Sequence, residues 1–367
     1  MADPEIKEKE GRVREFLDKR GLAGILLCRQ DNFSWFTAGK ANSVVMGADI
    51  GFTPILVTPT KKYIITNNIE APRIMEEEVQ NQGFELVSLA WYHFDSEFLN
   101  RVKNLAEGRV GSDAPFPGLE LVGKEFSELR YILTADEIER YRWLGTQSTK
   151  AMEESCREIK AGQTEFQIGA CLAKKLFNQG ITPSVLLVGT DERIFNYRHP
   201  VPTEKKLQKY AMIVVVAVKG GLNVALTRLV HFGPPPQEIV EKHKAVVNVD
   251  ATLITSTVPG KSYSEIFDKG ARAYAQAGYP DEWKKHFQGG PIGYGPREFN
   301  ATFETHQEVL VNQAVAWNPT ITGVKSEDTF IVTGKDREII TTTDNWPVVE
   351  IEIEGQVIQR HGILQRE

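Results

Sequence analysis

The sequence predicts an α+β protein with two domains, in which a small α/β domain precedes a larger domain of helices and mostly antiparallel strands. The chain has 367 residues, and at roughly 150 residues per domain this length corresponds to two domains. Strand and helix patterns alternate over about the first 110 residues, which is typical of an α/β unit. Residues 112–118, rich in Pro, Gly and Asp, then interrupt the pattern. We therefore expect domains at residues 1–118 and 119–367.

The elements of the first domain follow from apolar periodicity and from stop signals. Residues 1–20 have apolar side chains spaced among charges, as in an amphipathic helix, and Gly21 ends it. Residues 23–28 (AGILLC) then form a buried strand. The next predicted elements are a hairpin (51–57 and 61–66), a helix (69–82), a strand (84–89), a helix (97–108) and a strand (109–114).

The second domain begins with helices that carry their own capping signals. Thr134 and Glu137 form a capping box at the start of the helical stretch 129–159, and Thr164 opens the next helix, 164–180, in the same way. Two more helices are expected at 236–256 and 262–278. Strands are expected at 184–189, 211–218, 223–233, 308–319, 328–334 and 348–360.

Composition excludes several classes of protein. Hydrophobic residues make up 41% of the chain and charged residues 25%, as in a globular protein. The formal charge of −6 gives a nucleic acid no general electrostatic reason to bind. No apolar run is long enough to span a membrane, and the N-terminus lacks a signal-peptide core, so we expect a cytoplasmic protein. The scattered Cys28, Cys156 and Cys171 are interpreted as buried thiols.

Three stretches are unusual for structure alone. In residues 195–203 (FNYRHPVPT), prolines brace a polar loop around His199, a side chain suited to proton transfer near neutral pH; the alternative is an ordinary surface histidine. Residues 286–298 contain four glycines with a His, Tyr, Arg and Glu, which suits either a backbone close to a ligand or a tight structural connection. In residues 317–329, Glu327 and Asp328 begin a strand, where they either serve a site or cap a turn. Walker, Gly-x-Ser-x-Gly and His-Glu-x-x-His motifs are absent.

With these stretches in order, nearly the whole chain resembles the creatinase/aminopeptidase P/prolidase family. Residues 129–142 look like its Arg…Lys-x-x-x-Glu-Ile helix, residues 198–216 like its His-x-Pro-Thr…Gly-Asp segment, and residues 31–39 belong to a part similar to its N-terminal domain. The resemblance implies a pita-bread C-terminal domain preceded by a smaller α/β creatinase-like domain. It also implies a homodimer in which the partner's N-terminal domain lies near the cleft.

The resemblance does not carry over the metal site of the family's peptidases. Those enzymes hold two metal ions with two Asp, one His and two Glu, and only one His and one Glu remain here. We therefore expect no metal and no other cofactor. The five ligand positions carry Val214 or Ala217, Ala225, His286, Asn318 and Glu327.

The family's metal-free enzyme, creatinase, resembles the chain more closely in its site loops. Residues 286–298 align on its His…Tyr-x-Gly-Arg-Glu stretch, and His199 lies in the loop of its catalytic histidine. The carboxylates that recognise creatine are replaced by Thr227 and Asn318, so creatine itself is not expected as the substrate, because a guanidinium needs anionic partners. The resemblance implies His199, His286 and Glu327 as catalytic residues, and Arg297, Glu298, Asn318, Tyr294 and Thr227 as substrate-binding residues.

Three hypotheses about function follow. The first is a metal-independent hydrolase or lyase that cleaves a C–N bond in a small amide-, amidino- or peptide-like molecule, with His199 as general acid and base. The second is a non-catalytic pseudopeptidase that binds a peptide or metabolite in its cleft. The third is an Xaa-Pro peptidase with an atypical metal at His286 and Glu327, which lacks a third protein ligand.

Overall fold

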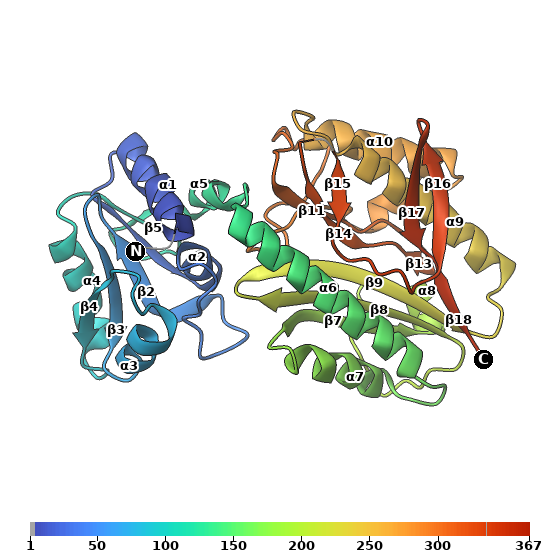
Figure 1. Cartoon of the computed structure of the whole chain (residues 1–367), viewed down its shortest axis with the longest axis horizontal. Helices are drawn as coiled ribbons and strands as arrows, with labels where there is room; N and C mark the ends of the chain where they lie inside the picture. The colour runs from blue at the N-terminus through green and yellow to red at the C-terminus, as the bar shows by residue number, and fades with distance from the viewer. Residues whose placement is uncertain (1–3, 335) are drawn as a thin grey trace. The chain divides into compact units, whose positions relative to one another are not determined.

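The computed structural model describes residues 4–334 and 336–367 (Figure 1). By their contacts these residues form two compact units. The first runs to Tyr131 and includes Gly220–Leu222, and the second comprises Ile132–Lys219 and Asn223–Glu367. Among the residues described, no helix is long and apolar enough to cross a membrane.

The first unit is built on a six-stranded mixed sheet in the order β4-β3-β2-β1-β5-β6. Strand β1 pairs antiparallel with β2 and parallel with β5, as in an α/β unit with one hairpin. Leu26 and Cys28 of β1 point to one face, where they pack with Phe98 and Val102 of α4. The elements are α1 (Pro4–Arg20), β1 (Gly24–Arg29), α2 (Gln30–Phe36), β2 (Ile50–Val57), β3 (Lys62–Asn67), α3 (Ala71–Arg73), η1 (Ile74–Glu78), β4 (Glu85–Leu89), α4 (Phe94–Leu105), β5 (Val110–Ser112), β6 (Glu120–Leu121), α5 (Gly123–Ser127) and η2 (Glu128–Arg130).

The predicted helix at residues 69–82 is shorter than expected and changes type. One turn of α-helix, α3, passes into the π-helix η1, whose backbone bond from Val79 N to Ile74 O spans five residues. Pro72 lies at the start of α3, where its missing N–H costs little. The π-turn was not predicted, because apolar periodicity does not distinguish it from an α-turn.

The second unit contains two four-stranded sheets, each accompanied by a pair of helices (Figure 1). Helices α6 and α7 contact the sheet β7-β8-β9-β18, and α9 and α10 pack on each other beside the sheet β10-β11-β14-β15. The helices are α6 (Ala135–Glu158), α7 (Glu165–Phe177), α8 (Glu192–Asn196), α9 (Gln237–Ser256), α10 (Tyr263–Gln276) and η3 (Glu282–Lys285). The strands are β7 (Thr182–Thr190), β8 (Tyr210–Lys219), β9 (Leu222–Phe232), β10 (Gly289–Pro291), β11 (Gln313–Trp317), β12 (Thr320–Ile321), β13 (Val324–Lys325), β14 (Asp328–Val332), β15 (Arg337–Ile339), β16 (Val348–Ile353), β17 (Gln356–His361) and β18 (Ile363–Arg366).

Local sequence signals account for where these elements begin and turn. The capping boxes at Thr134 and Thr164 are both formed, each with the side chain of the third helical residue returning to the cap N–H. The predicted strand at 348–360 is a hairpin, β16–β17, in which Glu354 and Gly355 both have positive φ, as a two-residue type I′ turn requires. One cysteine differs from expectation, because Cys171 is only partly buried and donates to Glu158.

Candidate active site

Two histidines from separate segments of the second unit meet side by side. Nε2 of His199, in the loop after α8, lies 3.1 Å from Nε2 of His286, directly after η3. His286 is 9% exposed, whereas His199 is exposed to solvent. The exposed ring of Phe287 stacks on His286 with centroids 4.4 Å apart. The pair thus has one solvent-facing member and one buried member.

The loop around His199 is held in place by contacts of its neighbours. The carbonyl of Pro200 accepts a hydrogen bond of 3.1 Å from Val188 N in β7. Arg198 donates to the carboxylate of Glu282 at 2.7 Å and to Thr322 Oγ1 at 2.9 Å. Because Glu282 lies in η3, just before His286, the Arg198–Glu282 ion pair joins the two segments that carry the histidines.

Both histidines are neutral near pH 7. Burial lowers the pKa of His286 to about 3, and the nearby charge of Lys325 lowers it further. The part of the His199 ring that faces the protein is desolvated, and this partial burial, together with the same Lys325 charge, lowers the pKa of His199 below its ordinary value of 6.5. When two neutral imidazoles share a contact through Nε2, one must donate a proton and the other must accept it. The pair therefore carries one lone pair and one N–H at the contact.

Glu327 lies in the same site and is held by two cations. Lys325 Nζ is 2.9 Å from Oε2, and Arg297 is 3.1 Å from Oε1. Thr227 on β9 donates its hydroxyl to Oε2 at 2.7 Å. Burial alone would raise the pKa of Glu327, but the charges of Lys325 and Arg297 outweigh burial and hold it below the usual range. Glu327 is therefore an ionised carboxylate with both oxygens engaged.

Lys325 is a site residue that the sequence analysis missed. It is 4% exposed and lies two residues before Glu327 in an extended segment. Side chains two residues apart in an extended chain point to the same face. That spacing was the available signal, and it is weak because a lysine near a strand end is ordinarily a solvated charge.

Asn318 faces the same site from the neighbouring strand. In the antiparallel pairing of β11 with β14, Trp317 lies opposite Asp328, and the bond from Ser326 N to Pro319 O continues this register. Asn318 therefore lies opposite Glu327, and directly opposed residues share a face of the sheet. The Asn318 side chain is 2% exposed, and its Oδ1 has no hydrogen-bond partner among the described residues.

The other predicted substrate-binding residues brace the loop at 286–298. Tyr294 donates its hydroxyl to Glu137 of α6 at 2.7 Å, and Glu298 accepts from the backbone N of Gly295 at 3.0 Å. A Cβ added at Gly289 would lie 2.2 Å from the carbonyl oxygen of Ala316. The protein's own backbone therefore requires that glycine, which favours the tight structural connection over the ligand-approach interpretation of the loop.

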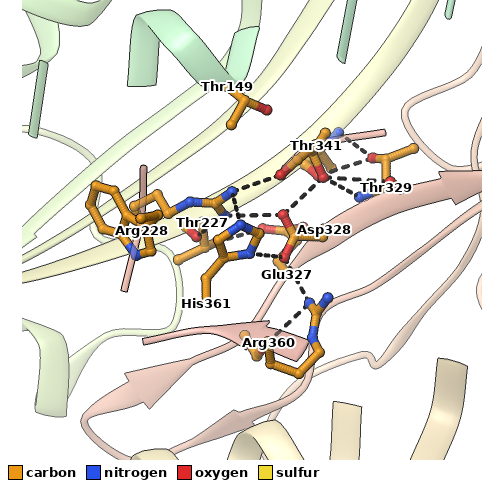
Figure 2. Close-up of polar contacts among 12 residues, drawn as sticks. Thr149, Thr227, Arg228, Glu327, Asp328, Thr329, Thr341, Arg360 and His361 are labelled. Carbon is orange, nitrogen blue, oxygen red and sulfur yellow. Dashed lines mark hydrogen bonds and ion pairs between the residues drawn. The ribbon is translucent and has the colours of Figure 1, made fainter. Parts of the chain in front are cut away.

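Asp328 belongs to a buried polar network (Figure 2). Because successive side chains of an extended strand alternate in direction, Asp328 points away from the side that Glu327 faces. Its carboxylate accepts hydrogen bonds from Arg228 at 3.0 Å, Arg360 at 2.7 Å and Thr341 at 2.8 Å, and lies 2.8 Å from Nδ1 of His361. The predicted Glu-Asp pair thus divides into two functions: Glu327 faces the site, and Asp328 anchors the strand that carries it.

Comparison with known proteins identifies the family. The profile of metallopeptidase family M24 matches residues 139–334, more than half of the chain. The chain belongs to metallopeptidase family M24. Its fold is pita-bread: an Xaa-Pro dipeptidase from Bacillus anthracis superimposes with a TM-score of 0.77 at 19% identity, covering 98% of this chain and 100% of that one.

Two sequence relatives extend the comparison. The Xaa-Pro dipeptidase of Pyrococcus horikoshii is 21% identical over 92% of this chain and 98% of its own length. An uncharacterised peptidase of Staphylococcus haemolyticus is 25% identical over 74% of this chain and 84% of its own length.

The family name implies a metal, but the residues of this M24 chain do not fit a paired metal site. The expected aspartate positions carry Val214 or Ala217 and then Ala225, all of which are buried hydrocarbon side chains. Both oxygens of Glu327 are engaged by protein donors. Across residues 4–334 and 336–367, no group of three or more His, Cys, Asp or Glu is arranged to hold a metal ion.

Proposed function

We propose that this M24 protein is a metal-independent hydrolase, or a lyase, that cleaves a C–N bond in a small amide-, amidino- or peptide-like molecule. The 3.1 Å contact between His199 and His286 carries the proposal. An exposed histidine that is neutral at pH 7 can accept a proton, and a buried neutral partner keeps its ring in one orientation. The relatives named Xaa-Pro dipeptidases also cleave C–N bonds, which supports this choice of bond.

The productive tautomer has the Nε2–H of His199 donated to Nε2 of His286. Nδ1 of His199 then carries the lone pair that removes a proton from water. The water oxygen attacks the carbonyl or amidino carbon, and the imidazolium of His199 is stabilised by the lone pair of His286. His199 next gives its proton to the leaving nitrogen as the C–N bond breaks. The products gain one OH on carbon and one H on nitrogen, and the histidine returns to its neutral form.

The remaining side chains would position the reacting groups. Glu327 is ionised and fixed by Lys325, Arg297 and Thr227, so it can orient a donor group of the substrate without moving. Asn318 lies opposite it with an unsatisfied amide oxygen. We assign Tyr294 and Glu298 to holding the loop that presents Arg297.

Two alternatives remain distinguishable by experiment. The names of the relatives favour an Xaa-Pro peptidase that recruits a metal through His286 and Glu327. A pseudopeptidase that binds a peptide or metabolite without cleaving it is the other alternative. It is compatible with the loss of three expected metal ligands, whose positions carry Val214 or Ala217, Ala225 and Asn318.

The test is product analysis in ¹⁸O-water with a chelator present. A panel of Xaa-Pro dipeptides, N-acyl amino acids and amidino acids is incubated with the wild type, His199→Ala and His93→Ala, an exposed histidine of the first unit that serves as the control. We expect turnover that resists EDTA, a loss of ~100-fold or more in His199→Ala, and no change in His93→Ala. Incorporation of ¹⁸O identifies hydrolysis, and its absence identifies elimination.

Other results would overturn the proposal. Activity that EDTA abolishes and Mn²⁺ restores would show that the protein is a metal-dependent peptidase. Turnover that persists in His199→Ala would show that His199 is not the general acid and base. No turnover of any compound would favour the pseudopeptidase.

A further inference from the structure

A cavity of about 460 Å³ lies in the first unit, where strands β1 and β5 end. Arg29, the last residue of β1, and Asp113, which directly follows β5, both line it. These strands are parallel neighbours, and the chain leaves β1 towards β2 but leaves β5 towards β6 on the other side. In open α/β sheets, ligands bind at such a reversal of strand order, outside the carboxyl ends of the strands. The cavity also has the volume of a small-molecule site, which is roughly 300–1,000 Å³.

The carboxylate of Asp113 is buried in this cavity and receives only neutral donors. The residue is 5% exposed. Its side chain accepts hydrogen bonds from the backbone N–H groups of Cys28 and Arg29 and from the amide of Asn32. A carboxylate has roughly four acceptor positions, so about one is left for a ligand. Burial raises the pKa of Asp113 to about 6, which leaves the group mostly ionised at pH 7.

The arginines of the cavity do not neutralise Asp113. Arg29 and Arg130 both pair with Asp31, at 3.2 Å and 3.0 Å. Across residues 4–334 and 336–367, no basic side chain forms an ion pair with Asp113. A buried charge without a counter-ion is costly, so a cation that entered the cavity beside Asp113 would be bound favourably.

Lys124 is an unmatched charge of the opposite sign at the same cavity. It lies in α5, is exposed, and has no ion-pair partner among the residues that the structure describes. The neighbouring carboxylate of Glu125 lies 4.0 Å from Arg20. Helix α5 begins close to the strand end, because a Cβ added at Gly123 would lie 2.8 Å from the carbonyl oxygen of Asp113. The unmatched carboxylate and the unmatched ammonium group therefore come from adjacent segments.

We propose that this cavity binds a free α-amino acid with an apolar side chain, whose ammonium group contacts Asp113 and whose carboxylate contacts Lys124. A ligand with one charge of each sign matches the two unmatched charges, and a primary ammonium supplies the N–H donor for Asp113. Pro115 and Leu121 line the same cavity, and Leu121 is 61% exposed, so an apolar side chain would cover hydrocarbon surface there. Binding at this place is independent of the chemistry at His199.

The test compares L-leucine with two analogues that each lack one charged group. L-Leucinol keeps the ammonium group but has a hydroxyl in place of the carboxylate, and isocaproate keeps the carboxylate but lacks the amine. Neither analogue contains an amide bond, so turnover does not interfere. Calorimetry near pH 7, at constant ionic strength, uses the wild type, Lys124→Met, Lys124→Arg and Asp113→Asn. Lys7→Met is the matched control, because Lys7 is an exposed lysine of α1 that does not line the cavity.

We expect L-leucine to bind the wild type, Lys124→Arg and Lys7→Met with similar affinity, and Lys124→Met and Asp113→Asn at least ~10-fold more weakly. Both analogues should bind the wild type at least ~10-fold more weakly than L-leucine does. Because Lys124 is exposed, Lys124→Met decides the matter if Asp113→Asn does not fold.

Four results would overturn the amino-acid site. Unchanged binding of L-leucine in Lys124→Met would place the amino acid elsewhere on the protein. Leucinol that binds as tightly as L-leucine would remove the carboxylate contact, and isocaproate that does so would remove the ammonium contact. The fourth is the absence of saturable binding to the wild type at up to ~10 mM L-leucine.

Discussion

Arg198 donates a 2.7 Å hydrogen bond to Glu282, and this contact joins two segments that are 84 residues apart in the chain. His199 follows Arg198 directly, and His286 lies four residues after Glu282. The position of the histidine pair thus depends on an ion pair outside it. Glu282 also accepts from the backbone N of Thr322 at 2.8 Å, so the turn between β12 and β13 is fixed by the same carboxylate.

Replacement of Arg198 should therefore affect both stability and activity. Arg198→Met removes a largely buried charge-assisted bond, and we expect unfolding to become easier by about 1–3 kcal/mol, measured by urea denaturation. Turnover should fall more than the stability loss explains, because His199 loses its fixed position. Lys284→Met is the control, since Lys284 pairs with Asp281 on the surface next to the same segment. Equal effects of the two substitutions would contradict a specific role for Arg198.

Stability should decrease when the pH falls from 6.5 towards 5. The pKa of His243 is lowered to about 4, mainly by burial, so the folded form stays neutral while the unfolded form takes up a proton below its own pKa of 6.5. A lowered histidine pKa thus gives stability that is complete above pH 6.5 and is lost as the pH falls towards 4. For each such histidine, the free energy of unfolding changes by up to about 1.4 kcal/mol per pH unit.

The variant His243→Gln isolates this effect. Urea unfolding at pH 7 and pH 5 should show a smaller stability difference in the variant than in the wild type. Burial raises the pKa of Asp113 to about 6, so this carboxyl contributes to the pH dependence of stability with the opposite sign. Because Asp113 is present in both proteins, its contribution cancels in the comparison. Identical pH dependence in the two proteins would show that His243 does not resist protonation.

Asp328 is expected to be essential for folding rather than for catalysis. It is the common acceptor for Arg228, Arg360 and Thr341 in the buried network of Figure 2. Asp328→Asn leaves buried arginines without this charge, and we expect a loss of about 3–5 kcal/mol in the free energy of unfolding. Glu338→Gln, which removes one oxygen charge from the partly exposed bidentate contact with Arg142, should cost about 1 kcal/mol or less. A loss below ~1 kcal/mol for Asp328→Asn would show that the network tolerates the missing charge.

The sequence predicted the fold well where local rules decide the structure. Thr134 and Thr164 predict the starts of their helices. In each capping box the threonine hydroxyl and the side chain of the Glu or Gln at the third helical position accept hydrogen bonds from backbone N–H groups at the helix start. The short strands β12 and β13 were not predicted, since each has two residues and shows no periodicity. The π-helix η1 was missed for a different reason: over a few residues its apolar pattern is that of an α-helix.

The site was only partly predictable, because its electrostatics depend on tertiary contacts. The resemblance pointed to His199 and His286, but only the structure shows that their Nε2 atoms lie 3.1 Å apart. Glu327 was recognised as a lone surviving carboxylate, whereas Lys325 was not considered. A buried lysine can be recognised only when its counter-charge is known. The two-residue spacing of Lys325 and Glu327 places both side chains on one face, but it indicates an ion pair only once the structure shows that both are buried.

The metal content of the folded protein separates the proposed chemistry from that of peptidases in the same family. A catalytic metal usually needs three protein ligands, and in this site Glu327 is bound by Lys325, Arg297 and Thr227. A divalent cation would have to displace Lys325 and then lie beside Arg297, which is electrostatically unfavourable. We expect elemental mass spectrometry of folded protein, purified without chelator or nickel, to find far less than one metal ion per chain. One or two tightly bound Mn, Zn or Fe ions per chain would mean that other residues replace the missing aspartates, and the metal-independent mechanism would have to be abandoned.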